Sequence, residues 1–247
     1  MPDDVDYVVN VSGQNVLDPL RRWTPGFQQN VFASRVETNR MLSNAIAQKR
    51  DKPPKAFVTI SGVGFYPPDT DMEYTEDSSG GDHDFLSRLC LEWENASKCN
   101  DVDVRNVILR SGIVIGPNGG IIKEMYPFFW LGLGAKIGSG QQYMPWIHIQ
   151  DLVQLFIESI HNERYRGVIN AVAPQIITNA QFTKAFGRAM WRPTFLTIPE
   201  QVIDLIFSSD RAVMMTKGQK VISSKLKDLG FQFQFPDIEN ALKNVVK

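Results

Sequence analysis

The sequence predicts an α/β fold, in which a parallel sheet is joined to a small, mainly helical C-terminal lobe. Over the first half of the chain, short β-branched runs that end at glycine or serine alternate with amphipathic segments of helical spacing. This alternation is typical of parallel strands joined by right-handed crossover helices. Beyond residue 120 the alternation becomes less regular and apolar helical patterns prevail. The first half therefore predicts most of the sheet, and the second half predicts the lobe.

The composition excludes several classes of protein. A chain of 247 residues with 43% hydrophobic content can bury one large core, with or without a small second lobe. Its net charge of −1 gives no overall attraction to nucleic acid or to an anionic membrane. The longest apolar-rich stretch, residues 125–133, is far shorter than the ~20 residues of a membrane-spanning helix. We therefore expect a small-molecule or protein partner, and neither nucleic acid nor membrane.

Cysteine usage and the first residues favour a reducing compartment. Cys90 and Cys99 form neither a C-x-x-C pair nor a ladder of metal ligands. Acidic residues stand at the start of the chain, where a secretory signal carries positive charge. His83 lies between two aspartates without a second ligand at metal-site spacing, so no metal site is expected. We expect a cytoplasmic location.

Three strands and two helices are expected in the first half. Each strand is a short apolar run before a turn residue, and each helix repeats apolar residues at roughly helical intervals. The strands are expected at residues 6–12, 56–60 and 104–109, and the helices at residues 27–49 and 85–98. Residues 67–84 are rich in Asp, Ser, Gly and Pro, so they predict a loop that either borders a site or is a solvated insertion.

The second half is expected to contain mostly helices. Asp151 is placed as an N-cap or first-turn acid, Thr178 as an N-cap, and Pro199 at the first turn of a helix. Helices are expected at residues 121–134, 152–161, 179–190 and 237–246 and from Pro199 onward, with strands at residues 143–149 and 167–173.

Six short motifs occur in an order and spacing that resemble those of a known protein family. They are NVSG at 10–13, LRRW at 20–23, SRVET at 34–38, RSGIVIG at 110–116, PWIHIQD at 145–151 and KGQKV at 217–221. Together they resemble the extended short-chain dehydrogenases/reductases, and in particular their atypical, epimerase-like branch. The resemblance covers essentially the whole chain. It implies a Rossmann-like sheet that carries NADP, with NAD as the alternative, and a C-terminal lobe over a substrate cleft.

The resemblance also implies a division of the chain and a set of cofactor contacts. The cofactor domain would comprise residues 1–118 and 144–173, and the substrate-side lobe residues 119–143 and 174–247. At the end of the first strand, Val11, Ser12 and Gly13 would contact the phosphate and ribose of the cofactor. On the following helix, Asn30 and Arg35 would add polar and cationic contacts. On a later strand, the main chain at Val114 would hold the nicotinamide amide.

Three of these positions have a plainer interpretation. Gly13 is also suited to a tight turn, Arg35 to an exposed charge on a helix, and Val114 to the core of a strand.

The front of the chain departs from the family pattern. A dinucleotide site depends on a G-x-x-G-type loop after the first strand, and the run at residues 6–12 is followed by no such loop. The resemblance implies that the first strands of the sheet are missing, which would leave residues 7–11 as an open apolar edge. From this we expect a truncated gene model or splice form that folds poorly alone.

The catalytic pair of the superfamily is also not recognisable. In the superfamily, a tyrosine with a lysine four residues later transfers the proton, because the lysine and the nicotinamide charge lower the pKa of the tyrosine. This chain places Phe85 and Leu89 at those positions, and Asp84 and Arg88 in the adjacent register. Neither pair supplies the same chemistry.

Ser61 and Tyr66 are the remaining candidates for a hydroxyl that polarises or protonates a substrate. Their plainer interpretations are a strand-end hydroxyl bonded to backbone and a packed loop aromatic. For His148, which lies in a strand before a helix cap, we expect a structural role.

Three hypotheses follow. The chain is an NADP-dependent oxidoreductase or epimerase that acts on a small carbonyl or alcohol, or it is a catalytically inactive member that binds a cofactor or a partner. The third is a truncated isoform that binds nothing. A homodimer is expected if residues 27–49 and 85–98 pair between subunits.

Overall fold

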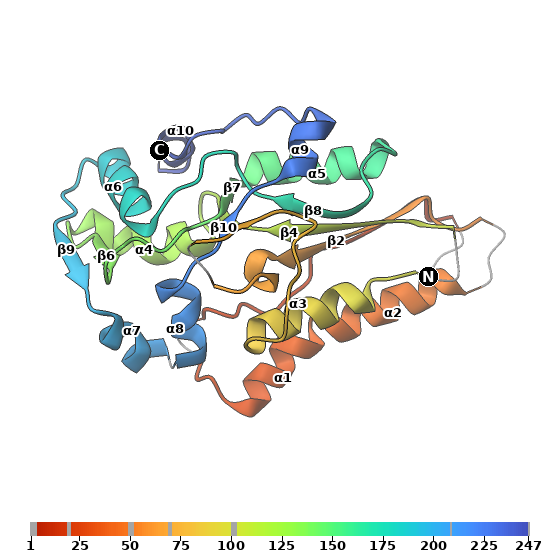
Figure 1. Ribbon diagram of the computed structural model, residues 1–247, viewed down its shortest axis with the longest axis horizontal. Coiled ribbons are helices and arrows are strands. Elements are labelled where there is room, and N and C mark those ends of the chain that lie inside the picture. Colours follow the sequence, from red (N-terminus) through yellow and green to blue (C-terminus); the bar gives the residue numbers. More distant parts are fainter. Residues whose placement is uncertain are drawn as a thin grey trace.

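A four-stranded parallel sheet forms the centre of the molecule in the computed structural model, which describes residues 4–18, 21–48, 52–68, 71–99, 103–207 and 209–246. The strands are β1 (Tyr7–Asn10), β2 (Ala56–Gly62), β4 (Arg105–Ser111) and β8 (Gly167–Ala171), in the order β1-β2-β4-β8 (Figure 1). Every neighbouring pair is parallel. The predicted α/β fold is therefore confirmed.

Helices cover both faces of this sheet. α2 (Val36–Ala47) and α3 (Phe85–Ala96) lie on one face, and α5 (Ile149–His161) and α9 (Ser224–Leu229) on the other (Figure 1). Successive side chains of β2 point to opposite faces, as the two-residue period of a strand requires. Val58 packs into the core that contains Leu155 of α5, whereas Phe57 packs against Ile46 of α2.

β1 lies at the edge of the sheet. Among the described residues it pairs with β2 alone, and Val9 and Val11 are exposed. The open edge expected from the sequence is therefore present, and strands with unpaired edges are prone to pair with other strands.

The long helix expected at residues 27–49 is wrong, because two helices occupy this stretch. α1 (Pro25–Ala33) ends before Ser34, and α2 begins at Val36. The Ser34 hydroxyl donates to Val31 O at 2.9 Å and accepts from the backbone N–H of Gln14 at 3.0 Å. A serine hydroxyl that bonds to nearby backbone competes with the helical ladder. Lys49 lies outside the described residues.

Several short strands were not expected. β3 (Glu73–Tyr74) lies within the expected loop at residues 67–84 and pairs with β10 (Lys220–Val221). β5 (Ile113–Ile115) pairs with β7 (Trp146–His148), and β6 (Ala135–Ile137) pairs with β9 (Leu196–Ile198). Residues 69–70 of the expected loop and Leu20 of the LRRW motif lie outside the described part of the chain.

The strand expected at residues 143–149 is longer than the strand in the structure. It is limited to β7, because Ile149 already belongs to α5. His148 is the N-cap of this helix, and its Nδ1 accepts from Gln150 N at 3.2 Å, which is the structural role expected for it. Asp151 lies in the first turn, as predicted.

A second core joins three helices of the C-terminal half. α4 (Gly120–Trp130), α6 (Asn179–Met190) and α10 (Ile238–Val245) pack around Phe129, Phe182 and Phe186. Thr178 caps α6, as predicted, and α7 (Glu200–Phe207) and α8 (Ser209–Thr216) follow β9. Each helix in the described ranges is too short or too polar to cross a lipid bilayer.

Asp151 fixes the C-terminal segment to the main body. Its carboxylate is fully buried and accepts from the backbone N–H groups of Gln234 at 2.6 Å and Phe235 at 3.1 Å. These bonds place the residues that lead into α10 beside the start of α5.

Replacing Asp151 by alanine should destabilise the fold by about 3 kcal/mol, because two buried backbone donors lose a charged acceptor. Urea denaturation followed by circular dichroism measures the free energy of unfolding. Asp228→Ala, at an exposed position of α9, is the control and should unfold like the wild type. Equal stability of the Asp151 variant and the control would contradict the proposed role of this carboxylate.

Candidate functional site

The loop that follows β1 is open at the carboxyl end of the strand. Val11 is 63% exposed, and Gly13 is also exposed. Ser12 N donates to Asn10 Oδ1 at 3.0 Å, and its hydroxyl donates to Ser34 O at 3.2 Å. The backbone at residues 11–13 is therefore held in one conformation while it remains accessible to a ligand.

A buried amide pair supports this loop from below. Asn10 Nδ2 donates to Asn39 Oδ1 at 2.5 Å, and Asn39 Nδ2 donates to Thr59 Oγ1 at 3.2 Å. These contacts join β1, α2 and β2. Asn39 is not among the residues predicted from the sequence. The feature that could have indicated it is a polar residue on the apolar side of the predicted helix at residues 27–49.

The guanidinium of Arg35 lies directly over Gly13. A Cβ atom built on Gly13 would be 2.8 Å from Arg35 Cζ, so a side chain at this position would displace the guanidinium. Arg35 Nη1 donates to Val31 O at 3.2 Å, and the guanidinium lies 5.1 Å from the ring centre of Trp93. Burial lowers the pKa of Arg35. It has no acidic partner within the described ranges. A cation beside an open backbone loop suits an anionic ligand.

The structure brings together four of the six predicted cofactor residues. Val11, Ser12, Gly13 and Arg35 meet at the end of β1, with Arg35 in the break between α1 and α2 rather than on a helix. Asn30 is exposed on α1, and its carbonyl accepts from Ser34 N at 2.9 Å. Val114 pairs with Ile147 in the separate β5–β7 sheet.

An ion pair holds the ends of the central strands on the α3 side. Arg110 Nε and Nη2 each donate to the carboxylate of Glu94 at 2.8 Å, and Ser61 Oγ donates to Glu94 Oε1 at 3.0 Å. The two charged side chains are 5% and 7% exposed. Burial alone would lower the pKa of Arg110, but the hydrogen bonds that Arg110 donates to Glu94 hold this pKa above its ordinary value. The hydroxyl of Ser61 is thus a hydrogen-bond donor to the buried carboxylate of Glu94.

Tyr66 extends the same network. Arg110 Nη1 donates to Tyr66 Oη at 2.9 Å, and Tyr66 Oη lies 2.8 Å from Asn170 Oδ1, to which it donates. Burial raises the pKa of Tyr66, although Arg110 acts in the opposite direction. The phenol is 1% exposed and remains a neutral donor near pH 7. Neither candidate hydroxyl is free in this arrangement.

Glu76 ties this network to the C-terminal segment. Its carboxylate accepts from Asn170 N at 3.0 Å, Ser223 Oγ at 2.6 Å and Ser224 Oγ at 2.7 Å. Burial alone would raise the pKa of Glu76, but the hydrogen bonds from both serines and Asn170 hold this pKa below its ordinary value.

α3 carries no proton-transfer pair at the expected positions. Phe85 packs edge-on against Trp23 with ring centres 5.0 Å apart, and Leu89 is buried. In the adjacent register, Asp84 caps α3 by accepting from Ser87 N at 2.8 Å, while Arg88 is exposed. The departure noted in the sequence is therefore also present in the structure.

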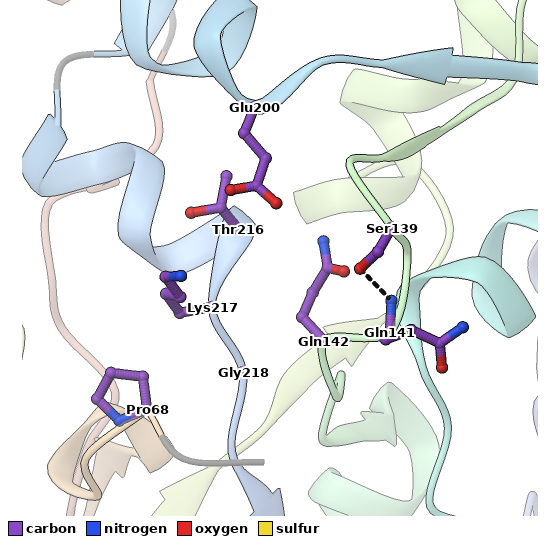
Figure 2. A pocket seen from close by; sticks show the side chains of 8 residues that line it. All are labelled: Pro68, Ser139, Gln141, Gln142, Glu200, Thr216, Lys217 and Gly218. Atoms are coloured by element: carbon purple, nitrogen blue, oxygen red, sulfur yellow. Dashed lines mark hydrogen bonds between the residues drawn. The ribbon is translucent and has the colours of Figure 1, made fainter.

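A polar recess of about 420 Å³ lies between the turn after β6, the first residue of α7 and the end of α8 (Figure 2). Figure 2 shows Lys217 and Pro68 on one side of it and Ser139, Gln141 and Gln142 on the other. It is lined by Pro68, Ser139, Gln141, Gln142, Glu200, Thr216, Lys217 and Gly218. None of the predicted site residues lines it. Within the described residues no three His, Cys, Asp or Glu side chains gather as metal ligands.

Comparison with known proteins gives consistent results. Residues 2–171 match the model of the NAD dependent epimerase/dehydratase family, and residues 198–245 match a domain of unknown function, DUF1731. The chain is 44% identical over 242 residues to the epimerase family protein SDR39U1 of Bos taurus, covering 98% of this chain and 82% of the bovine protein.

Solved structures agree. A crystal structure of human epimerase family protein SDR39U1 (isoform2) with NADPH superposes with a TM-score of 0.96 at 43% identity, covering 99% of this chain and 82% of the human one. A nucleoside-diphosphate sugar epimerase from Corynebacterium glutamicum gives a TM-score of 0.76 at 26% identity, covering 98% of this chain and 46% of the other.

Glu76 should make stability depend on acid pH. Because its folded-state pKa is depressed, its contribution is full above the ordinary value of 4.5 and is lost as pH falls through the folded-state pKa. The difference in unfolding free energy between wild type and Glu76→Gln should therefore be large at pH 7 and shrink below that value. Urea titrations from pH 7 to pH 3 measure it. Asp77→Asn, exposed in the same turn, should show little difference throughout, and a pH-independent effect of Glu76→Gln would contradict the argument.

Proposed function

Because this chain belongs to the NAD-dependent epimerase/dehydratase family, we propose that it binds NADP, with NAD as the alternative. In this proposal it acts as an oxidoreductase or epimerase on a small carbonyl or alcohol. The observation that carries the binding proposal is the Arg35 guanidinium, which lies over Gly13 without an acidic partner in the described part of the chain.

The residues at the strand ends fit such a cofactor. Ligands of open parallel sheets bind beyond the carboxyl ends of the strands, and the backbone of Val11, Ser12 and Gly13 is accessible there. In this proposal Arg35 faces a phosphate, Asn30 adds a polar contact, and the main chain at a later strand holds the nicotinamide amide. That last position is Val114. The NADPH in the human relative, 43% identical to this chain, supports the same ligand.

The substrate is proposed to lie between the cofactor portion, residues 1–118 and 144–173, and the C-terminal portion, residues 119–143 and 174–247. The polar recess belongs mainly to the second portion. There the Glu200 carboxylate can accept from a substrate hydroxyl, and Lys217 can donate to a carbonyl or an anionic group. When bound, the nicotinamide would supply hydride transfer.

A second candidate function is cofactor binding without catalysis. Phe85 and Leu89 replace the proton-transfer pair, and the hydroxyls of Ser61 and Tyr66 are engaged in the Glu94–Arg110 network. We infer that both hydroxyls position the strand ends rather than touch the substrate. Fluorescence titration with NADPH, followed by assays of hydride transfer, distinguishes the two functions.

Arg35→Ala should weaken NADPH binding about tenfold or more, since a hydrogen bond to a charged group contributes roughly 1.5–3 kcal/mol. Fluorescence titration gives the dissociation constants. Arg40→Ala removes a cation one turn further along α2, where it pairs with Glu37 at the surface, and should leave the affinity unchanged. Unaltered affinity of a folded Arg35 variant would refute the proposed phosphate contact, and the absence of binding by wild type would refute the cofactor proposal.

Oxidation of NADPH against a panel of small carbonyls should reveal turnover if the chain is an enzyme. Tyr66→Phe should then keep turnover within about threefold of wild type, because removing a true general acid costs about 10²–10⁴-fold. The same variant should melt at a lower temperature, since Arg110 loses an acceptor. A loss of 100-fold would identify Tyr66 as the proton donor, whereas no turnover with any carbonyl would favour the non-catalytic function.

A further inference from the structure

One end of the molecule carries most of the apolar side chains that face solvent. Eleven of the 18 large apolar side chains exposed in the described part of the chain lie in two segments, residues 126–133 and 191–206. Trp191 and Phe195 are each 90% exposed, and Leu205 is 86% exposed. Apolar patches beyond a few hundred Å² are uncommon on soluble monomers and mark interaction sites. We call these two segments the apolar face.

The two segments of the apolar face meet in space. Arg192 Nε donates to Trp130 O at 2.8 Å, and a Cβ built on Gly132 would lie 3.9 Å from Pro193. β9 belongs to the second segment and pairs with β6, which directly follows the first. Figure 1 shows α4, β6, β9 and α7 at the same end of the molecule. An apolar recess of about 410 Å³ hollows the first segment around Trp130.

The exposed area is large enough for a stable interface. Aromatic side chains carry about 150–250 Å² each, so the exposed fractions of the five aromatic side chains on the apolar face correspond to roughly 500–800 Å². The six exposed Leu, Ile and Val side chains add to this area. A standard protein interface buries about 800 Å² on each partner. In such interfaces, Trp and Tyr side chains near the centre contribute much of the binding free energy.

We propose that the apolar face docks a second copy of this chain in a two-fold symmetric dimer. The charged residues of the two segments are Arg192, Glu200 and Asp204, so the segments themselves lack the Lys- and Arg-rich composition of a membrane-binding helix.

The edge of β9 identifies a second copy as the occupant. Within the described ranges β9 pairs with β6 on one side and with no strand on the other, and Leu196 and Thr197 are exposed. An identical edge strand related by a two-fold axis runs antiparallel and offers matching N–H and C=O groups. Two β6–β9 pairs thereby become one continuous sheet across the dimer.

The alternative dimer, through the helices expected at residues 27–49 and 85–98, has less support. Glu37 and Arg40 form a surface ion pair at 2.6 Å on α2. Among the described residues of α2 and α3, Met41 is the only exposed large apolar side chain, at 72%. This surface is polar and offers no apolar centre for an interface.

Sedimentation velocity of the full chain without NADPH, over a range of protein concentrations, tests the proposal independently of the cofactor proposal. The wild type should be a dimer. Phe195→Glu and Trp191→Glu should each weaken association by roughly 30-fold or more, the effect of losing one anchor residue. Met41→Glu introduces the same charge on α2 and should leave the dimer intact. Thermal melts verify that each variant is folded, and both face positions are too exposed for the substitutions to disturb a core.

Several results would overturn the proposal. These are a wild type that is monomeric at every concentration, a dimer that survives Phe195→Glu and Trp191→Glu together, and a dimer that Met41→Glu dissociates while the two face variants do not. Sedimentation with vesicles of neutral and of anionic lipid adds one more test. A monomer that binds vesicles through Phe195 would show that the face meets a membrane instead.

Discussion

The buried ion pair between Glu94 and Arg110 is the constraint on which the centre of this fold depends. A charge removed from water is tolerated only when it is paired and its remaining donors and acceptors are satisfied. Arg110 meets this condition with two bonds to Glu94 and one to Tyr66. The pair thereby fixes α3, β4 and the loop after β2 relative to one another. Through Asn170 and Glu76 the same network reaches the segment at Ser223.

This network has a direct consequence for chemistry. The hydroxyl of Ser61 near the end of β2 and that of Tyr66 in the loop beyond it are engaged with the buried charges of Glu94 and Arg110. The accessible polar groups lie instead at the end of β1 and in the recess near Glu200. In the proposed function, the anionic cofactor and the substrate therefore contact different parts of the molecule.

Two of the strand edges that stay unpaired in the described part of the chain lie beside exposed apolar side chains. β1 exposes one side of the main sheet, and β9 exposes one side of the small sheet near the apolar face. Unpaired strand edges and apolar side chains both favour association. At β9 the two occur together with aromatic side chains such as Phe195. The part of the chain around β9 is for this reason the part best suited to contact another molecule.

The sequence by itself determined the alternation of strands and helices, the cap at Thr178, the family, and the absence of a tyrosine–lysine pair at Phe85 and Leu89. These features depend on residues near one another in the chain, so local pattern and motif order reveal them. Only the tertiary structure decided the break at Ser34, which depends on a bond from Gln14, and the engagement of Ser61 with Glu94. The short paired strands β3 and β10 belong to the same group. Their partners are 20 to 150 residues distant, and no local pattern records a hydrogen bond formed only when the chain has folded.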